Sequence, residues 1–213
     1  METIRGRQSL DLNWNEWKER LANYNRVHLD LGTGDGRYVR TLAAGNPDWL
    51  VIGVDACREN LRAHSQAKLQ NMLFIIAAAQ SLPRELNGWV SHLTINFPWG
   101  SLLEGLLRGD PALLNGIASA CRATASIDLR LNGGALSEAG TTLEAGTEMI
   151  HANLLRAGWQ IAPPAPMNAR ELRSFPSTWA KRLAFGRDPR AMALKGWIAA
   201  QTQNIEPLAI VQF

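Results

Sequence analysis

Residues 30–37 read Asp-Leu-Gly-Thr-Gly-Asp-Gly-Arg, and this stretch decides the fold. The apolar segment before it, Val27 to Leu29, is typical of a buried parallel strand, and a helical pattern follows from Tyr38 to Ala44. A glycine-rich turn between strand and helix lets the backbone approach a ligand closely and directs helix N–H groups toward it. The stretch therefore predicts a ligand-binding turn at one edge of an α/β sheet.

A carboxylate at the end of the next strand narrows the kind of ligand. The apolar segment 50–54 is followed by Asp55, about 20 residues after the glycines, where an acidic side chain can accept both hydroxyls of a ribose. Gly32 and Gly34, preceded by Asp30, belong to a G-x-G-x-G pattern, which favours S-adenosylmethionine; NAD sites more often carry G-x-G-x-x-G. The pattern alone leaves open a nicotinamide-dependent oxidoreductase, and also a tight turn that binds no ligand.

The composition fits one globular domain over residues 1–213. Hydrophobic residues make up 46% of the chain, which is enough for a full core, but no apolar run is long enough to span a bilayer. We find no signal-peptide pattern, and the histidines and cysteines form no metal-binding motif. We therefore expect a cytoplasmic monomer without a membrane partner or a metal ion.

Positive charge is concentrated near the C-terminal end. Residues 170–190 hold six Lys and Arg against two Asp and Glu, so the net charge of this segment is +4. The net charge of the whole chain is +3, so the remaining residues sum to −1. A charge run of this kind is typical of a solvated helix face, and equally of a surface that binds phosphates.

Strand-like and helix-like segments alternate along the chain. We expect strands near 27–31, 50–55, 72–77, 90–96, 124–131, 159–162 and 191–201, with 207–212 pairing beside the last. We expect helices near 14–22, 37–44, 58–68, 80–87, 101–108, 111–120 and 143–157, an extended segment or hairpin over 3–12, and a loop over 132–142. This order predicts an α/β fold with a doubly wound, mostly parallel seven-stranded sheet and an N-terminal extended segment.

Three further segments are expected near the ligand, because ligands bind at the carboxyl ends of the strands in such sheets. Ala77 to Gln80 offers small residues beside a flat base, and Gln80 is a donor and acceptor for its edge, although alanines also serve helix packing. Asn96 to Trp99 places a proline and an aromatic residue at a strand end, a corner typical of methyltransferases that act on nitrogen. The third segment, 174–187, sets Trp179 among hydroxyl and basic groups, which suits base stacking and phosphate contact.

Four blocks of the sequence resemble a known family. They are residues 26–37, residues 77–83 (Ala-Ala-Ala-Gln-Ser-Leu-Pro), residues 97–103 (Phe-Pro-Trp-Gly-Ser-Leu-Leu) and residues 179–187 (Trp-Ala-Lys-Arg-Leu-Ala-Phe-Gly-Arg). Together they are similar to the kanamycin–apramycin resistance methyltransferases, over about residues 4–200. Members of that family are Rossmann-like S-adenosylmethionine-dependent enzymes that methylate N1 of adenine 1408 in 16S ribosomal RNA on the assembled 30S subunit.

The resemblance implies a role for each matching residue. The residues implied to hold or border the cofactor are Asp30, Gly32, Gly34, Asp55, Ala79, Gln80 and Ser101. Trp99 and Trp179 would stack on the two faces of the flipped adenine with Ser177 in support, and we place Trp179 on a loop between the last strands. Arg182 and Arg187 would contact RNA.

Two positions depart from the family pattern. Gln80 stands where some relatives carry Glu, which alters the charge of one expected adenine contact. The segment 67–71 is short where relatives often have a longer, lysine-rich linker that helps to dock on the ribosome. Two alternatives remain open at this point: a methyltransferase of the transfer-RNA guanine-N7 type, and a non-catalytic S-adenosylmethionine-binding module associated with the ribosome.

Overall fold

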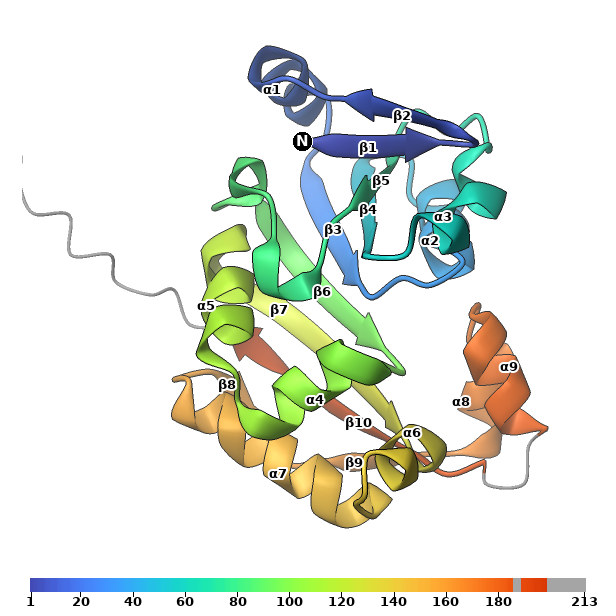
Figure 1. Cartoon of the computed structure of the whole chain (residues 1–213), viewed down its shortest axis with the longest axis vertical. Coiled ribbons are helices and arrows are strands. Elements are labelled where there is room, and N and C mark those ends of the chain that lie inside the picture. The colour runs from blue at the N-terminus through green and yellow to red at the C-terminus, as the bar shows by residue number, and fades with distance from the viewer. Residues whose placement is uncertain (186–188, 199–213) are drawn as a thin grey trace, which may run out of the picture.

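A computed structural model describes residues 1–185 and 189–198, apart from the side chains of Trp179, Leu183 and Ala184. Within these residues ten strands form one sheet (Figure 1). The strands are β1 (Glu2–Arg5), β2 (Gln8–Asp11), β3 (Arg26–Leu31), β4 (Trp49–Asp55), β5 (Met72–Ile76), β6 (Val90–Asn96), β7 (Cys121–Asn132), β8 (Gln160–Ile161), β9 (Ala165–Met167) and β10 (Ala191–Ile198). Their order across the sheet is β2-β1-β5-β4-β3-β6-β7-β10-β8, with β9 also paired to β10.

The expected count of seven strands was therefore too low. The N-terminal segment is a hairpin that adds two strands, since β1 pairs antiparallel with both β2 and β5. The strand expected near 159–162 is β8, and an unpredicted short strand, β9, follows Pro163 and Pro164 and also pairs with β10. The expected pairing over 207–212 lies outside the described residues.

The middle of the sheet positions the ligand-binding edge. Strands β3 to β7 are mutually parallel, and the chain turns back at β3, which lies between β4 and β6. Ligands in doubly wound sheets bind outside the carboxyl ends of the strands at this point of reversal. The register places Asp30 between Gly53 of β4 and Thr94 of β6, so the first glycine-rich turn emerges at that point.

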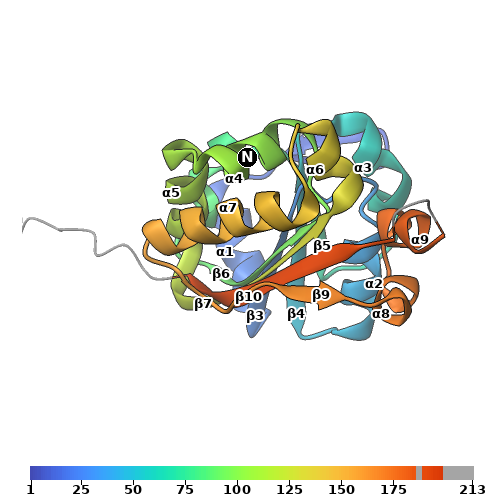
Figure 2. The ribbon, with the colours of Figure 1, turned by 90° about the horizontal axis from the view of Figure 1, so that it is seen from below.

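Helices cover both faces of the sheet. They are α1 (Trp14–Ala22), α2 (Arg37–Gly45), α3 (Arg58–Ser65), α4 (Gly100–Arg108), α5 (Pro111–Ala120), α6 (Gly133–Glu138), α7 (Leu143–Arg156), α8 (Ala169–Ser174) and α9 (Thr178–Ala184). Helices α4, α5 and α7 lie over one face (Figure 2), and α2 and α3 pack against β4 and β5. The core is made by buried side chains such as Leu29, Ile52 and Ile95. No described helix has the length and apolar character that crossing a membrane requires.

Three local predictions were wrong. The helix expected near 80–87 is two short 3-10 turns, η1 (Ala79–Ser81) and η2 (Arg84–Leu86), because Pro83 between them cannot continue a helix. The loop expected over 132–142 contains α6, which the Asn132 side chain caps by accepting from the Ala135 amide at 2.8 Å. Trp179 lies in helix α9 rather than on a loop.

Candidate functional site

A cavity of about 440 Å³ opens at the carboxyl ends of the parallel strands. Its walls come from the β3–α2 loop, the end of β4, residues 77–79, the corner between β6 and α4, and Ser177 just before α9. Segments far apart in sequence therefore share one cavity, and the sites expected from four separate motifs border it together.

The β3–α2 loop requires glycine at its turn positions. Gly32, Gly34 and Gly36 have φ of 71°, 58° and 75°, a region that favours glycine. A Cβ on Gly36 would lie 2.5 Å from the Phe74 ring, and one on Gly32 would lie 2.7 Å from Leu102. The third glycine is thus needed for packing as well as for the turn, and the first leaves room where the loop meets α4.

Asp55 is oriented by backbone amides. Its Oδ2 accepts from the Gly34 amide at 2.8 Å, and its Oδ1 accepts from the Cys57 amide at 2.8 Å. Oδ1 also accepts from Asn60 Nδ2 at 3.5 Å. These bonds hold the carboxylate at the cavity wall, and Oδ2 keeps lone-pair capacity for a further donor. The arrangement suits the vicinal hydroxyls of a ribose, as predicted for this position.

Asp30 is a buried carboxylate with an unusual proton affinity. It is 1% exposed, and its Oδ1 accepts from Thr94 Oγ1 and Asn96 Nδ2, both at 2.7 Å. Burial raises the pKa of Asp30 to about 6, and these hydrogen bonds oppose the rise without cancelling it. Near neutral pH the group is a carboxylate at the cavity wall, held in place by polar side chains. A positively charged ligand in the cavity would stabilise this ionised form.

The corner between β6 and α4 is strained. Phe97 has a φ of 56°, which is uncommon for a bulky residue, and its ring is 2% exposed. Its amide donates to the Arg130 carbonyl at 2.8 Å, which fixes this conformation against β7. The turn brings Pro98, Trp99 and Ser101 to the cavity. Strain of this kind is often found at functional sites, where neighbouring contacts hold it.

The segment after β5, residues 77–80, contributes to the cavity less directly than expected. Ala77, Ala78 and Ala79 line the cavity, as their small size predicts. The Gln80 amide instead donates to the Ser101 carbonyl at 3.1 Å and ties η1 to the start of α4. An adenine contact by Gln80 therefore stays a prediction, and the observed bond gives it a second role in placing Ser101.

Helices α8 and α9 form a small unit, residues 169–184, beyond the carboxyl ends of β6 and β7 (Figure 1). Ser177 borders the cavity, and the backbone places Trp179 two residues later in α9. Arg182 is exposed on the same helix. The side chain of Trp179 and the whole of Arg187 lie outside the described residues, so their predicted roles stay predictions.

Sequence reasoning missed the residues that fix this unit to the rest. Phe175 stacks on Tyr38 with ring centroids 5.1 Å apart and meets Phe97 edge-on at 5.9 Å. The Arg130 guanidinium lies 4.7 Å from the centroid of the Phe175 ring. These pairs join distant parts of the chain, and no short motif marks them.

Comparison with known proteins identifies the family. The family model described as "NpmA: 16S rRNA (adenine(1408)-N(1))-methyltransferase" matches residues 2–198. A 16S rRNA (adenine(1408)-N(1))-methyltransferase from Escherichia coli is 31% identical over 93% of this chain and 99% of its own.

Two solved structures agree with that match. The 16S rRNA methyltransferase KamB superposes with a TM-score of 0.84 at 32% identity, over 93% of this chain and all of its own. The aminoglycoside resistance methyltransferase NpmB1 gives a TM-score of 0.76 at 30% identity, over 93% and 99% of the two chains. With the strand order and the shared cavity described above, these matches show that the chain belongs to the NpmA family of 16S rRNA (adenine(1408)-N(1))-methyltransferases.

Proposed function

We propose that this chain methylates N1 of adenine 1408 in 16S rRNA of the assembled 30S subunit, with S-adenosylmethionine as methyl donor, and so confers resistance to kanamycin and apramycin. The observation that carries the proposal is one cavity bordered both by the glycine-rich loop with Asp55 and by the corner with Trp99. A nucleoside cofactor and a flat target base can then occupy adjoining parts of the same space.

The residues of the cavity fit the cofactor. The Asp55 carboxylate lies at the cavity wall, where it can accept from a ribose diol, and Gly32 has no room for a Cβ beside Leu102. The alanines at 77–79 leave a flat, apolar wall for an adenine ring. Asp30 adds negative charge, which favours the cationic donor. When bound, S-adenosylmethionine supplies an electrophilic methyl group on a sulfonium.

The chemistry asks the protein mainly for positioning. Adenine N1 carries a lone pair and no proton, so methyl transfer to it requires no general base. The product is cationic, and an indole face beside the base stabilises that charge as it develops. We assign Trp99 to one face of the adenine, Trp179 to the other, and Ser177 to support at the rim. Most of the rate enhancement then comes from holding N1 in line with the methyl group.

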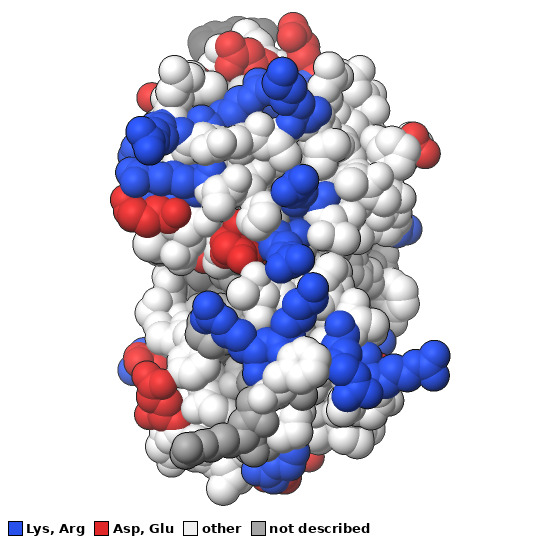
Figure 3. Space-filling model, turned by 90° about the vertical axis from the view of Figure 1, so that its right-hand side faces the viewer, with Lys and Arg blue, Asp and Glu red and all other residues white. Residues whose placement is uncertain are grey.

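The surface beside the cavity suits RNA. Exposed cations lie on the N-terminal hairpin, α2, α3, α8 and α9: Arg5, Arg7, Arg37, Arg40, Arg62, Arg170, Arg173, Lys181 and Arg182. Figure 3 shows Lys and Arg side chains in both the upper and lower halves of the face on which these elements lie. Such a surface favours a phosphate backbone. The short segment 67–71 retains a single lysine, Lys68, so we assign more of the docking to the arginines of the hairpin, α2 and α3.

Reverse transcription of treated ribosomal RNA tests the proposal. Methylation at N1 blocks the Watson–Crick edge, so purified 30S subunits incubated with the protein and S-adenosylmethionine should give a polymerase stop at adenine 1408. Free 16S rRNA should give a weaker stop if the assembled subunit is the substrate. A stop at another nucleotide would replace the assigned target. Labelled methyl transfer without any stop would indicate a position off the Watson–Crick edge, as in guanine-N7 methylation.

A further inference from the structure

A hydrogen bond links the cofactor loop to the unit that borders the base. Thr178 Oγ1 donates to Asp35 Oδ2 at 2.6 Å, across 143 residues of sequence. Asp35 lies between Gly34 and Gly36 in the β3–α2 loop and borders the cavity. Thr178 is the first residue of α9 and stands between Ser177 and Trp179.

Both carboxylate oxygens of Asp35 have a partner. Its Oδ1 accepts from the Arg37 amide at 3.0 Å, which orders the first turn of α2, while Oδ2 accepts from Thr178. The preceding residue, Gly34, donates its amide to Asp55 at 2.8 Å. A continuous path therefore runs from the carboxylate assigned to the ribose, through two consecutive loop residues, to the start of α9.

Aromatic packing also holds the unit formed by α8 and α9. Phe175 packs on Tyr38, which belongs to α2, and on the strained Phe97. These ring contacts and the Thr178 hydrogen bond together hold the turn 175–178 against the first turn of α2 and the β6–α4 corner. Loss of the hydrogen bond leaves the apolar packing in place, so we expect the unit to stay folded but to hold Ser177 and Trp179 less closely.

We propose that Asp35 and Thr178 form a positioning latch through which the cofactor loop fixes the base-contacting unit. The latch rests on the proposed function for its consequence in catalysis, but its mechanical part does not involve RNA. A cofactor that fixes Asp55 and Gly34 also fixes Asp35, and the charge-assisted hydrogen bond to Thr178 passes this constraint to α9. Coupling of this kind is reciprocal, so a loosened α9 also makes cofactor binding slightly weaker.

Hydrogen exchange without RNA tests the mechanical part. S-adenosylmethionine should slow amide exchange over residues 175–182 by at least about threefold in the native protein, a modest coupling on the usual scale. In Thr178→Val this protection should vanish, and in Thr178→Ser it should return. Ser174→Ala is the matched control, because the Ser174 hydroxyl donates to the Glu171 carbonyl within α8 and leaves the latch intact. Equal protection in Thr178→Val and the native protein would overturn the latch, as would equal loss in Ser174→Ala.

Methylation of 30S subunits tests the consequence. Removing a hydrogen bond to a charged acceptor should lower turnover by about tenfold in Thr178→Val, with recovery in Thr178→Ser. Asp35→Ala combined with Thr178→Val should lose no more turnover than Asp35→Ala alone, because both changes break one contact. Fully additive losses would contradict the latch. If Thr178→Val loses the exchange protection but keeps normal turnover, the mechanical coupling stands. The assigned role of α9 at the base is then wrong.

Discussion

The two halves of the cavity are built in different ways. In the half that we assign to the cofactor, backbone holds the loop and Asp55, through glycines with positive φ and amides that donate to the carboxylate. Asp30 is the exception, since the side chains of Thr94 and Asn96 hold it. The base-facing half is held by side chains from distant segments, such as Phe175 on Tyr38 and Thr178 on Asp35. The first kind of site is preformed by local sequence, whereas the second depends on tertiary contacts. We therefore expect the two halves to respond differently to substitution.

Asp55→Ala should produce the largest single effect, confined to the cofactor. Losing two hydrogen bonds to a charged acceptor, at about 1.5–3 kcal/mol each, should weaken S-adenosylmethionine binding by about a hundredfold to ten-thousandfold. Calorimetry on the variant checks this, with thermal unfolding to confirm that the fold is intact. Native affinity in a folded Asp55→Ala protein would remove the ribose assignment.

Substitution of Trp99 should affect the other half. Base stacking is worth about 1–3 kcal/mol, so Trp99→Ala should lower methylation of 30S subunits by about tenfold to a hundredfold. Trp99→Phe retains an aromatic face and should keep part of the activity, and Trp179 should rank in the same way. Kanamycin and apramycin resistance in cells gives a second readout. Full resistance with a folded Trp99→Ala or Trp179→Ala variant would return that tryptophan to a packing role.

Acidification should weaken cofactor binding through Asp30. Its pKa of about 6 in the folded protein means that the carboxyl becomes protonated as the pH falls below 6, and a cationic cofactor binds the carboxylate better. The affinity for S-adenosylmethionine should be level above pH 7 and fall by up to about tenfold per pH unit below 6. Calorimetry between pH 5 and 8 checks this. The control, Asp30→Asn, should bind more weakly at pH 8 and show a flatter profile; an unchanged slope would assign the titration to another group.

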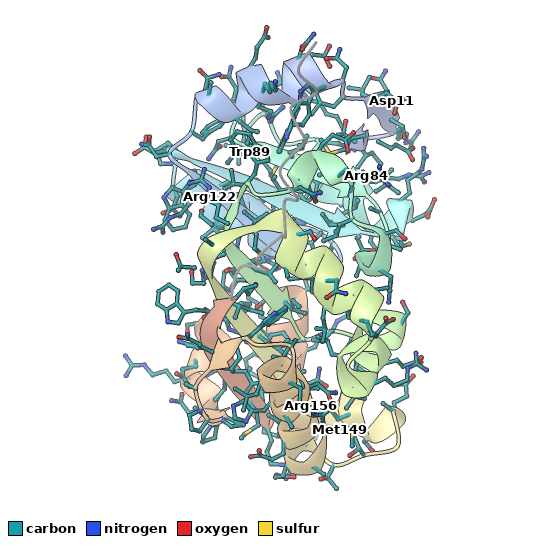
Figure 4. All side chains as sticks on the ribbon, turned by 90° about the vertical axis from the view of Figure 1, so that its left-hand side faces the viewer. Asp11, Arg84, Trp89, Arg122, Met149 and Arg156 are labelled. Carbon is teal, nitrogen blue, oxygen red and sulfur yellow. The ribbon has the colours of Figure 1, made fainter. Side chains whose placement is uncertain are left out.

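Charge reversal on α9 should give the smallest effect and spare the cofactor. Arg182→Glu should weaken 30S binding by about threefold to tenfold at moderate salt and reduce the salt slope by about one. The matched controls are Arg84→Glu and Arg122→Glu, whose side chains lie on the opposite side of the molecule (Figure 4). If the controls lose as much affinity as Arg182→Glu, the effect is one of net charge and the α9 surface has no special part.

The same division decides what the sequence could reveal. The glycines and Asp55 mark the cofactor half because turn and strand-end chemistry is local, and the parallel strands follow from apolar runs. The strand count was too low because the N-terminal hairpin joins the sheet through β1 and β5, and because β9, with three residues, is too short to leave a pattern. Helix α6 was missed because it has only six residues and begins with two glycines, which are poor helix formers. The hydrogen bond between Asp35 and Thr178 joins residues that share no motif and lie far apart in the sequence, so it can be found only in the folded structure.

Calorimetric titration of S-adenosylmethionine into Trp99→Ala, beside methylation of 30S subunits by the same protein, tests the division most directly. If the halves are separate, the cofactor affinity stays within about twofold of the native value while methylation falls by about tenfold or more. If Trp99→Ala instead loses cofactor affinity as severely as methylation, the tryptophan belongs to the cofactor half, and the account of two differently built halves is contradicted.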